Sequence, residues 1–376
     1  MHGTSILSKN NCRVCGKALL AEPLLKYENM PMVAQHLPDE ATIARDKGMD
    51  LEIYQCAGCG LVQLVGEPVS YYREVIRAAG ISPEMKEFRS GQFKDFVKKY
   101  SLAGKKIIEI GCGRGEYLTI MSQTGADAYG LEYGDDSAAQ CLKNGLKVSK
   151  GFVETEDYKI DNSPFDAFFV LSWLEHLPNL NLMLAGISNN LADGAVGIVE
   201  VPNFDMILRD NLFSEFMRDH LFYFTKETLK TTLQINGFEV LECKEVWHDY
   251  IISAVVKKRR KTDLALFSDK QAKLKKEIED YINRFAPGKV AVWGAGHQAF
   301  ATLALLNLEG KIKYVVDSAS FKQGKFTPAT HIPIVAPEKL NSDPVEAIII
   351  MAGSYADEVA KIIHEKYNGM AVLILN

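Results

Sequence analysis

The sequence predicts an α/β protein with two Rossmann-like units, each a parallel sheet covered by helices on both faces. Residues 106–115 and 289–296 each run from a short apolar stretch into a glycine turn that opens a predicted helix. Around these turns, apolar stretches of strand length alternate with helical segments, which is typical of parallel sheets. The 376 residues exceed what one hydrophobic core usually serves, so we expect two or three domains.

The first unit is organised around residues 106–118, KIIEIGCGRGEYL. The β-branched residues suit a buried strand. The glycines let the backbone turn sharply and approach a ligand closely: Gly111, Gly113 and Gly115. About twenty residues later, Glu132 ends the next apolar run, where a carboxylate can accept hydrogen bonds from a ribose diol. Glu109, just before the turn, is suited to the cationic amino-acid end of a ligand.

Residues 165–177, FDAFFVLSWLEHL, add an acid, a buried strand and a Leu-Glu-His-Leu turn. This ordered set resembles the class I S-adenosylmethionine (SAM)-dependent methyltransferases. The resemblance implies SAM as the cofactor and a cofactor site made of Glu109, Gly111, Gly113, Gly115, Glu132, Tyr133 and Trp173. The alternative is a different nucleotide-binding α/β domain with accidental acids.

Capping signals place the helices of this unit. Ser82 and Pro83 mark the start of a helix that we expect to reach about Tyr100. Thr225 caps a second helix over residues 226–236. We expect strands over residues 106–110, 127–132, 166–171 and 195–200, and another from residue 237.

Four of the seven cysteines form two C-x-x-C-G knuckles about forty residues apart: Cys12, Cys15, Cys56 and Cys59. Four thiolates complete a tetrahedral zinc shell without a vacant position, so we expect a structural zinc ribbon. The alternative is a pair of disulfides, which a cytosolic setting disfavours.

Residues 213–225, FSEFMRDHLFYFT, lie between predicted sheet elements and place Asp219-His220 among aromatic side chains. A buried aromatic setting lowers the pKa of an imidazole, which allows it to act as a base near neutrality. The alternative is that His220 only caps the following turn. Tyr72, in the loop before the helix at residue 83, is a further candidate that could close over the ligand site.

The C-terminal third has a second glycine turn, which contains Gly294 and Gly296. A strand over residues 312–317 ends in Asp317, and residues 347–351 form a later buried strand. Such a turn can seat a diphosphate, so it could hold a second cofactor or the nucleotide part of a substrate. A charged helix over residues 273–285 precedes it, and the basic run 257–261 is interpreted as a solvated linker.

Zinc ribbon, SAM domain and Rossmann-like domain, in this order, resemble the sugar C-methyltransferase family, whose members methylate a ring carbon of a nucleotide-linked keto-deoxysugar. The domains would be residues 1–65, 66–260 and 261–376. The resemblance rests on the paired knuckles, on E-x-G-C-G-x-G with the later Leu-Glu-His-Leu, and on residues 317–334 with Lys-Gln-Gly-Lys, Thr-Pro and His-Ile-Pro-Ile.

The resemblance also implies roles. A His base forms an enolate that takes the methyl group, and this role falls on His220, oriented by Asp219. His176 and Tyr72 would lie near the enolate oxygen, although His176 could instead be a structural turn residue. The third domain would help to hold the nucleoside diphosphate. The substrate candidates are His248, Gly294, Gly296, Asp317 and Lys325.

Three departures fall in the presumed sugar pocket. Asp219 replaces the family's Glu, Met217 replaces its tyrosine, and residues 248–251 read His-Asp-Tyr-Ile where the family has His-Gly-Gly-Ser. O- or N-methylation of another glycan or nucleotide-sugar group therefore stays open, as does a non-catalytic binding scaffold. The sugar, the methylated atom, the nucleotide, occupancy of the C-terminal turn, and the choice of monomer or dimer do not follow from the sequence.

The composition gives no reason to expect a nucleic-acid or membrane partner, because the net charge is −5 at pH 7. The first residues lack a charged start followed by an apolar core. No apolar run approaches the length of a membrane-spanning helix. We expect a cytoplasmic protein.

Overall fold

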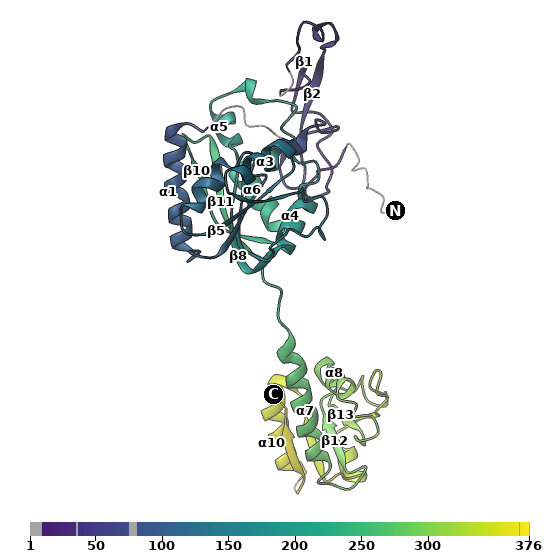
Figure 1. The fold of residues 1–376 in the computed structure, drawn as a ribbon. Coiled ribbons are helices and arrows are strands. Elements are labelled where there is room, and N and C mark those ends of the chain that lie inside the picture. The colour runs from purple at the N-terminus through teal and green to yellow at the C-terminus, as the bar shows by residue number, and fades with distance from the viewer. Residues whose placement is uncertain (1–9, 35–36, 75–80, 368, 376) are drawn as a thin grey trace. The chain divides into compact units, whose positions relative to one another are not determined.

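The structure is a computed structural model that describes residues 10–34, 37–74, 81–367 and 369–375. The chain divides into two compact units, Met1–Arg260 and Lys261–Asn376, whose elements are labelled in Figure 1. The cysteine-rich N-terminal segment belongs to the first unit.

The first unit is centred on a seven-stranded sheet in the order β10-β11-β8-β7-β4-β5-β6. Strand β11 is antiparallel to both of its neighbours, and the other pairs are parallel. This arrangement confirms the predicted α/β core. The strands are β4 (Lys106–Ile110), β5 (Asp127–Glu132), β6 (Lys147–Lys150), β7 (Phe165–Leu171), β8 (Leu191–Pro202), β10 (Phe238–Val246) and β11 (Ile251–Lys258).

Helices cover both faces of this sheet. One apolar cluster packs α1, α2 and α3 against it, and another packs α4, α6 and the cysteine knuckles. The central strand β4 sends Ile107 into the first cluster and Ile108 into the second, as expected of a strand buried on both faces. The helices are α1 (Pro83–Lys99), α2 (Glu116–Ser122), α3 (Asp135–Lys143), α4 (Leu180–Asn189), α5 (Phe204–Arg209) and α6 (Lys226–Ile235).

The predicted caps are present. The Ser82 hydroxyl accepts a hydrogen bond from the backbone N–H of Met85, and Thr225 forms a capping box at the start of α6. The prediction that residues 257–261 form a linker is wrong for Lys257 and Lys258. Both belong to β11, where backbone pairing with β8 and β10 outweighs the cost of placing charged side chains in a strand.

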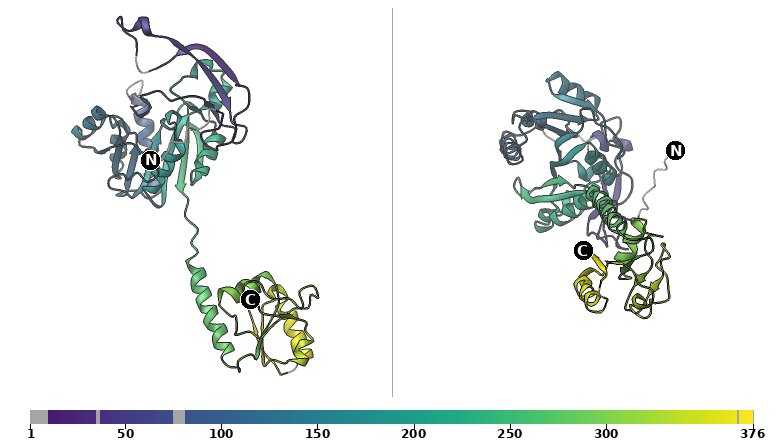
Figure 2. Two further views of the ribbon diagram at one scale, coloured as in Figure 1. Left: turned by 90° about the vertical axis from the view of Figure 1, so that its right-hand side faces the viewer. Right: turned by 90° about the horizontal axis from the view of Figure 1, so that it is seen from below.

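A four-stranded sheet, in the order β1-β2-β3-β9, connects the N-terminal segment to this core. The hairpin of β1 (Leu25–Pro31) and β2 (Gly48–Gln55) projects from the first unit (Figure 1), as Figure 2 also shows. Strand β3 (Val62–Leu64) pairs with β9 (Phe222–Tyr223), with Val62 opposite Tyr223. The chain just after the second cysteine knuckle is thereby joined to the strand that follows His220.

The second unit contains a parallel sheet in the order β14-β13-β12-β15-β16. Helices α7 and α8 pack on one face, and α9 and α10 on the other. Helix α7 begins at Ala265, earlier than the predicted residue 273. The elements are α7 (Ala265–Ile282), β12 (Val290–Trp293), α8 (His297–Leu305), β13 (Val315–Val316), β14 (Ile334–Val335), α9 (Lys339–Ser342), β15 (Ala347–Ile350), α10 (Ala356–Lys366) and β16 (Ala371–Ile374).

Candidate active site

The glycine turn lies between β4 and α2, at the carboxyl end of the parallel strands, where open α/β sheets bind ligands. Gly111, Gly113 and Gly115 all have positive φ, at 72°, 54° and 82°. A Cβ atom on Gly111 would lie 3.1 Å from the Trp173 ring. One on Gly115 would lie 2.4 Å from Leu146. Both conformation and space therefore favour glycine.

Glu132, at the end of β5, holds this turn in shape. Its Oε2 accepts a hydrogen bond from the Gly113 N–H at 2.7 Å, and its Oε1 accepts one from the Gly134 N–H at 2.8 Å. Each carboxylate oxygen has a second lone pair, so the side chain fits the predicted ribose diol. Glu109 is buried within β4, where it lies opposite Gly130 and Phe169.

Aromatic rings gather beside Glu132. Phe152 makes edge contacts with Tyr72, Tyr133 and Trp173, at centroid distances of 5.5 to 6.0 Å. The Arg73 guanidinium lies 5.3 to 5.6 Å from the rings of Tyr72, Tyr133 and Phe152. Tyr133 and Trp173, predicted as cofactor residues, thus share one aromatic cluster.

The two predicted histidines are brought together. His176 ends the 3₁₀ turn η3 (Leu174–His176) after β7, and His220 precedes β9. Their ring centroids are 4.7 Å apart in an edge-to-face contact. One side-chain atom from each of Glu175, His176 and His220 lies within 4.8 Å of the others. Backbone pairing fixes the arrangement, because the Leu221 N–H donates to the Glu175 carbonyl at 2.7 Å.

Burial keeps both rings neutral. It lowers the pKa of His176 to about 4, against a weaker opposing effect of Asp219. It lowers the pKa of His220 to about 3, helped by His176. Among the described residues, no hydrogen bond occupies the His220 ring, so its lone pair is available to a proton donor. His220 is nevertheless partly exposed to solvent, as a base that must contact a substrate requires.

Asp219 is placed differently from its predicted role. Its Oδ2 accepts a hydrogen bond from the Tyr71 hydroxyl at 2.9 Å, and its backbone carbonyl lies 2.8 Å from Nδ1 of His176. The described residues show no hydrogen bond between Asp219 and the His220 ring, so Asp219 orients His176. Of the two adjacent tyrosines, Tyr71 reaches this cluster, whereas Tyr72 packs on Phe152.

A buried polar network, absent from the sequence predictions, lies at the same end of the sheet. Arg89 of α1 pairs with Glu200 of β8 at 2.5 Å, and both side chains are at most 1% exposed. Gln92 donates to Glu200, also at 2.5 Å, and lies 3.3 Å from the Ser253 hydroxyl. Helical spacing offered a signal only for α1, since Arg89 lies one turn before the buried Phe93 on the same face.

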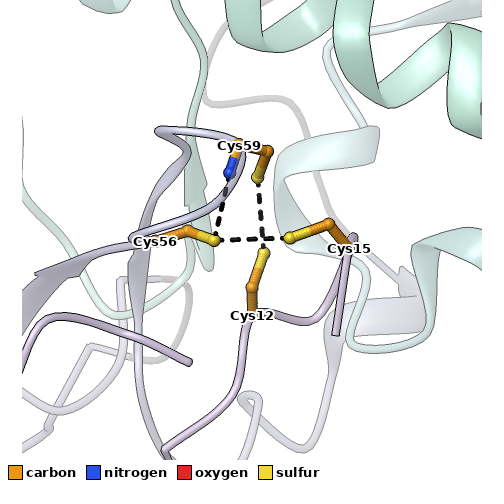
Figure 3. A group of neighbouring side chains, drawn as sticks. All are labelled: Cys12, Cys15, Cys56 and Cys59. Carbon is orange, nitrogen blue, oxygen red and sulfur yellow. Dashed lines mark hydrogen bonds between the residues drawn. The ribbon is translucent and has the colours of Figure 1, made fainter. Parts of the chain in front are cut away.

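The four knuckle cysteines converge (Figure 3). The Sγ atoms of Cys15 and Cys56 are 3.3 Å apart, and those of Cys12 and Cys59 are 3.7 Å apart. A tetrahedral zinc with bonds of about 2.3 Å separates its sulfurs by roughly 3.8 Å. Backbone N–H groups of Gly58 and Cys59 point at the Cys56 sulfur, as expected around thiolates. All four thiols are free, so the residues present fit a zinc ion.

His248, a predicted substrate residue, lies in the turn between β10 and β11. Its side chain is 70% exposed and its Nε2 lies 2.9 Å from Glu84 of α1. Trp247, His248 and Asp249 all have positive φ. The buried side chain of Asn203 holds the turn by donating to the Asp249 carbonyl.

In the second unit, Asp317 repeats the clamp seen at Glu132. Its Oδ2 accepts the Ala295 N–H and a hydrogen bond from Lys322, each within 2.9 Å. Burial opposes ionisation, but the Ala319 N–H and Lys322 outweigh it, so the pKa of Asp317 lies below its usual value. A Cβ on Gly294 would lie 2.5 Å from the Met351 carbonyl oxygen, which makes this glycine structural.

The remaining substrate candidates of the second unit are exposed. Gly296 is the N-cap of α8, and Lys325 lies in the loop that Asp317 and Lys322 anchor. Both are therefore accessible from solvent.

Comparison with known proteins identifies two domains. Residues 85–243 match a methyltransferase domain model, and residues 256–375 match a model described as the C-methyltransferase C-terminal domain. The C-methyltransferase NovU of Streptomyces niveus is 25% identical over 93% of this chain and 91% of its own length. A ubiquinone biosynthesis O-methyltransferase of Methylococcus capsulatus is 33% identical, over 21% of this chain and 35% of its own.

A solved SAM-dependent methyltransferase from Clostridium acetobutylicum aligns with 50% of this chain and 96% of its own, at 13% identity and a TM-score of 0.40. The domain matches show that the chain is a SAM-dependent methyltransferase with a class I fold and a C-terminal domain of the C-methyltransferase type. Within the described part of the chain, no helix has the length and apolarity needed to span a membrane.

Proposed function

We propose that this methyltransferase adds a methyl group to a carbon atom of a keto-sugar carried on a nucleotide. The observation that carries the proposal is the pair of neutral, touching imidazoles of His176 and His220, in a chain whose C-terminal domain is of the C-methyltransferase type. Carbon is a poor nucleophile unless a proton beside a carbonyl is removed first. An unprotonated base is therefore required, and both imidazoles are unprotonated near neutral pH.

His220 is the proposed base. SAM supplies a methyl group bound to a sulfonium and needs no activation, so the chain chiefly forms and aligns the nucleophile. His220 takes the proton from the carbon beside the carbonyl, and the electron pair of that bond moves to the carbonyl oxygen. Donors near the His pair stabilise the charge on that oxygen.

The glycine turn and Glu132 are proposed to hold the SAM ribose, and the aromatic cluster its adenine. The second glycine turn is proposed to hold the substrate's diphosphate, because the exposed Gly296 caps the N-terminus of α8 and helix N-termini attract phosphate. The four cysteines are proposed to hold a structural zinc ion.

The test is mass spectrometry of the protein incubated with SAM and nucleotide-linked 4-keto sugars in deuterated water. A gain of one methyl group, and deuterium uptake at the neighbouring carbon when SAM is left out, support enolate chemistry. Methylation of acceptors that lack a keto group, without exchange, would replace the proposal with O-methylation. The partial match to O-methyltransferases makes that outcome the relevant competitor.

His220→Asn tests the base. It should bind SAM with unchanged affinity but lose turnover and deuterium exchange together. His364→Asn is the matched control, because this histidine is exposed on α10 of the second unit. Wild-type exchange in His220→Asn would rule out His220 as the base.

A further inference from the structure

Three side chains of the candidate active site converge on one point. One ligand atom from each of Glu175, His176 and His220 lies within 4.8 Å of the other two. Oε1 of Glu175 lies 3.8 Å from Nε2 of His176. Around a tetrahedral zinc ion with bonds of about 2.0–2.2 Å, nitrogen and oxygen ligands are roughly 3.4 Å apart. Modest side-chain rotations would therefore bring the three atoms to coordination distance of one ion.

His176 is held in the way that metal-binding histidines are held. Its Nδ1 lies 2.8 Å from the backbone carbonyl oxygen of Asp219, and a carbonyl can only accept a hydrogen bond. Nδ1 therefore carries the proton of the neutral ring, and Nε2 carries the lone pair. Histidines that bind metals through one nitrogen commonly donate the other N–H to a backbone carbonyl, because this hydrogen bond fixes the tautomer and the orientation of the ring.

Glu175 gives an independent indication of a ligand. Its side chain is 1% exposed, and its Oε2 has no hydrogen-bond partner among the described residues. Leaving a buried polar atom without a partner costs free energy, and an ion that binds there is one explanation for such an atom. His220 is partly exposed, which gives an ion a path from solvent to the buried carboxyl group.

We propose that Glu175, His176 and His220 bind a divalent transition-metal ion such as Zn²⁺, at a site separate from the four cysteines. Two imidazoles and one carboxylate are a ligand set of metal sites that keep a coordination position open. Three ligands without a thiolate hold zinc less tightly than four cysteines, so we expect added metal to fill this second site and the purified protein to carry zinc only at the cysteines. Mg²⁺ prefers oxygen ligands and should not compete.

A metal ion at the second site is expected to inhibit methyl transfer. The neutral His220 ring has one lone pair in its plane, and a lone pair that coordinates a metal cannot take a proton from the substrate's carbon. Coordination oxidises and reduces nothing, and any proton on the Glu175 carboxyl group is released to solvent. The inhibition rests on the function proposed above, in which His220 is the base, whereas the metal site itself does not.

The first test measures binding to the full-length protein, with zinc at the cysteines and without substrate. Equilibrium dialysis against Zn²⁺ should raise the zinc content of wild type from one to two ions per chain, and dialysis against Mg²⁺ should not add an ion. Co²⁺ added to the same protein should give the visible absorption of cobalt with nitrogen and oxygen ligands, without the sulfur-to-cobalt charge-transfer band of a thiolate site. Wild-type protein that takes up no second ion overturns the proposal.

The ligands are tested by substitution. Glu175→Gln and His176→Asn should each weaken binding of the second ion by at least roughly 100-fold, since even the loss of a hydrogen-bond partner of a ligand typically costs 10- to 100-fold. Glu215→Gln is the matched control, because it removes a neighbouring carboxylate that pairs with Tyr250. Unchanged affinity in Glu175→Gln and His176→Asn overturns the proposal. Circular dichroism establishes that each variant folds, and if neither does, the cobalt spectrum of wild type decides.

The second test is kinetic and compares the rate of each protein with and without added Zn²⁺. Wild type and Glu215→Gln should lose activity over the zinc concentrations that fill the second site, whereas Glu175→Gln should keep its own metal-free rate at these concentrations. Equal inhibition of Glu175→Gln would place the inhibitory ion elsewhere, for example on the substrate's diphosphate, and overturns the inhibitory role. A second ion that binds without inhibiting overturns the role of His220 as the base but leaves the metal site, so the two proposals fail in distinguishable ways.

Discussion

Replacing Glu175 with glutamine is expected to stabilise the first unit at neutral pH. The carboxyl group is fully buried, and burial raises its pKa from 4.5 to about 8. Above pH 4.5 the unfolded chain loses this proton while the folded chain keeps it until about pH 8. The stabilising contribution of the protonated Glu175 to the free energy of unfolding is therefore fully present below pH 4.5. It is lost as the pH rises to 8.

The size of the effect follows from the interval between the two pKa values. Each pH unit inside that interval changes the free energy of unfolding by about 1.4 kcal/mol, so Glu175 costs about 3 kcal/mol at pH 7. Glutamine has nearly the same shape and does not titrate. The variant should match wild type near pH 4.5 and exceed it by about 3 kcal/mol at pH 7.

Urea unfolding followed by tryptophan fluorescence measures this difference. Of the three tryptophans, Trp293 lies in the second unit, so a Trp293→Phe background restricts the signal to Trp173 and Trp247 of the first unit. Wild type and Glu175→Gln are compared at several pH values from 4.5 to 8, with Glu215→Gln as control. A difference that does not change with pH would refute the reasoning, because it would show Glu175 ionised in the folded state.

Three further predictions concern other parts of the first unit. Arg89→Met should cost about 3–5 kcal/mol of unfolding free energy, because it leaves the buried Glu200 carboxylate without its cationic partner. Arg89→Met/Glu200→Met should recover most of this loss, and equal losses in the single and double variants would contradict the prediction. Gly111→Ala should cost at least about 1–2 kcal/mol from positive φ plus the Trp173 contact, with weaker SAM binding by calorimetry; unchanged affinity would contradict it. Zinc removal, or Cys56→Ser, should lower kcat more than it lowers the affinity for SAM. Elemental analysis should find one zinc per chain in wild type only.

Contacts between residues close in the chain, or at the ends of successive strands, could be predicted from the sequence. Gly113 and Glu132 are nineteen residues apart. They meet because the adjacent parallel strands β4 and β5 end at the same edge of the sheet. The convergence of the knuckles was predictable for a different reason, because a metal site in that spacing needs all four cysteines at one point. Helix caps at Ser82 and Thr225 depend only on neighbouring residues.

Contacts that bring remote segments together could not be predicted in this way. Tyr71 reaches Asp219 across 148 residues, and nothing local distinguishes it from Tyr72. The expectation that Asp219 orients His220 came from the resemblance to the sugar C-methyltransferase family. In the folded chain its carbonyl meets His176 instead, because the pairing of Leu221 with Glu175 turns the backbone of residues 219–221 toward η3.

The β3–β9 pairing connects the four-cysteine segment to the His pair. β3 begins three residues after Cys59, and the Leu64 N–H donates to the Leu221 carbonyl at 2.9 Å. Leu221 in turn donates to Glu175 and follows His220 directly. A metal that fixes the knuckles therefore fixes one side of the His pair, whereas the glycine turn and Glu132 belong to the central sheet. This separation is why loss of metal should affect proton transfer before it affects cofactor binding.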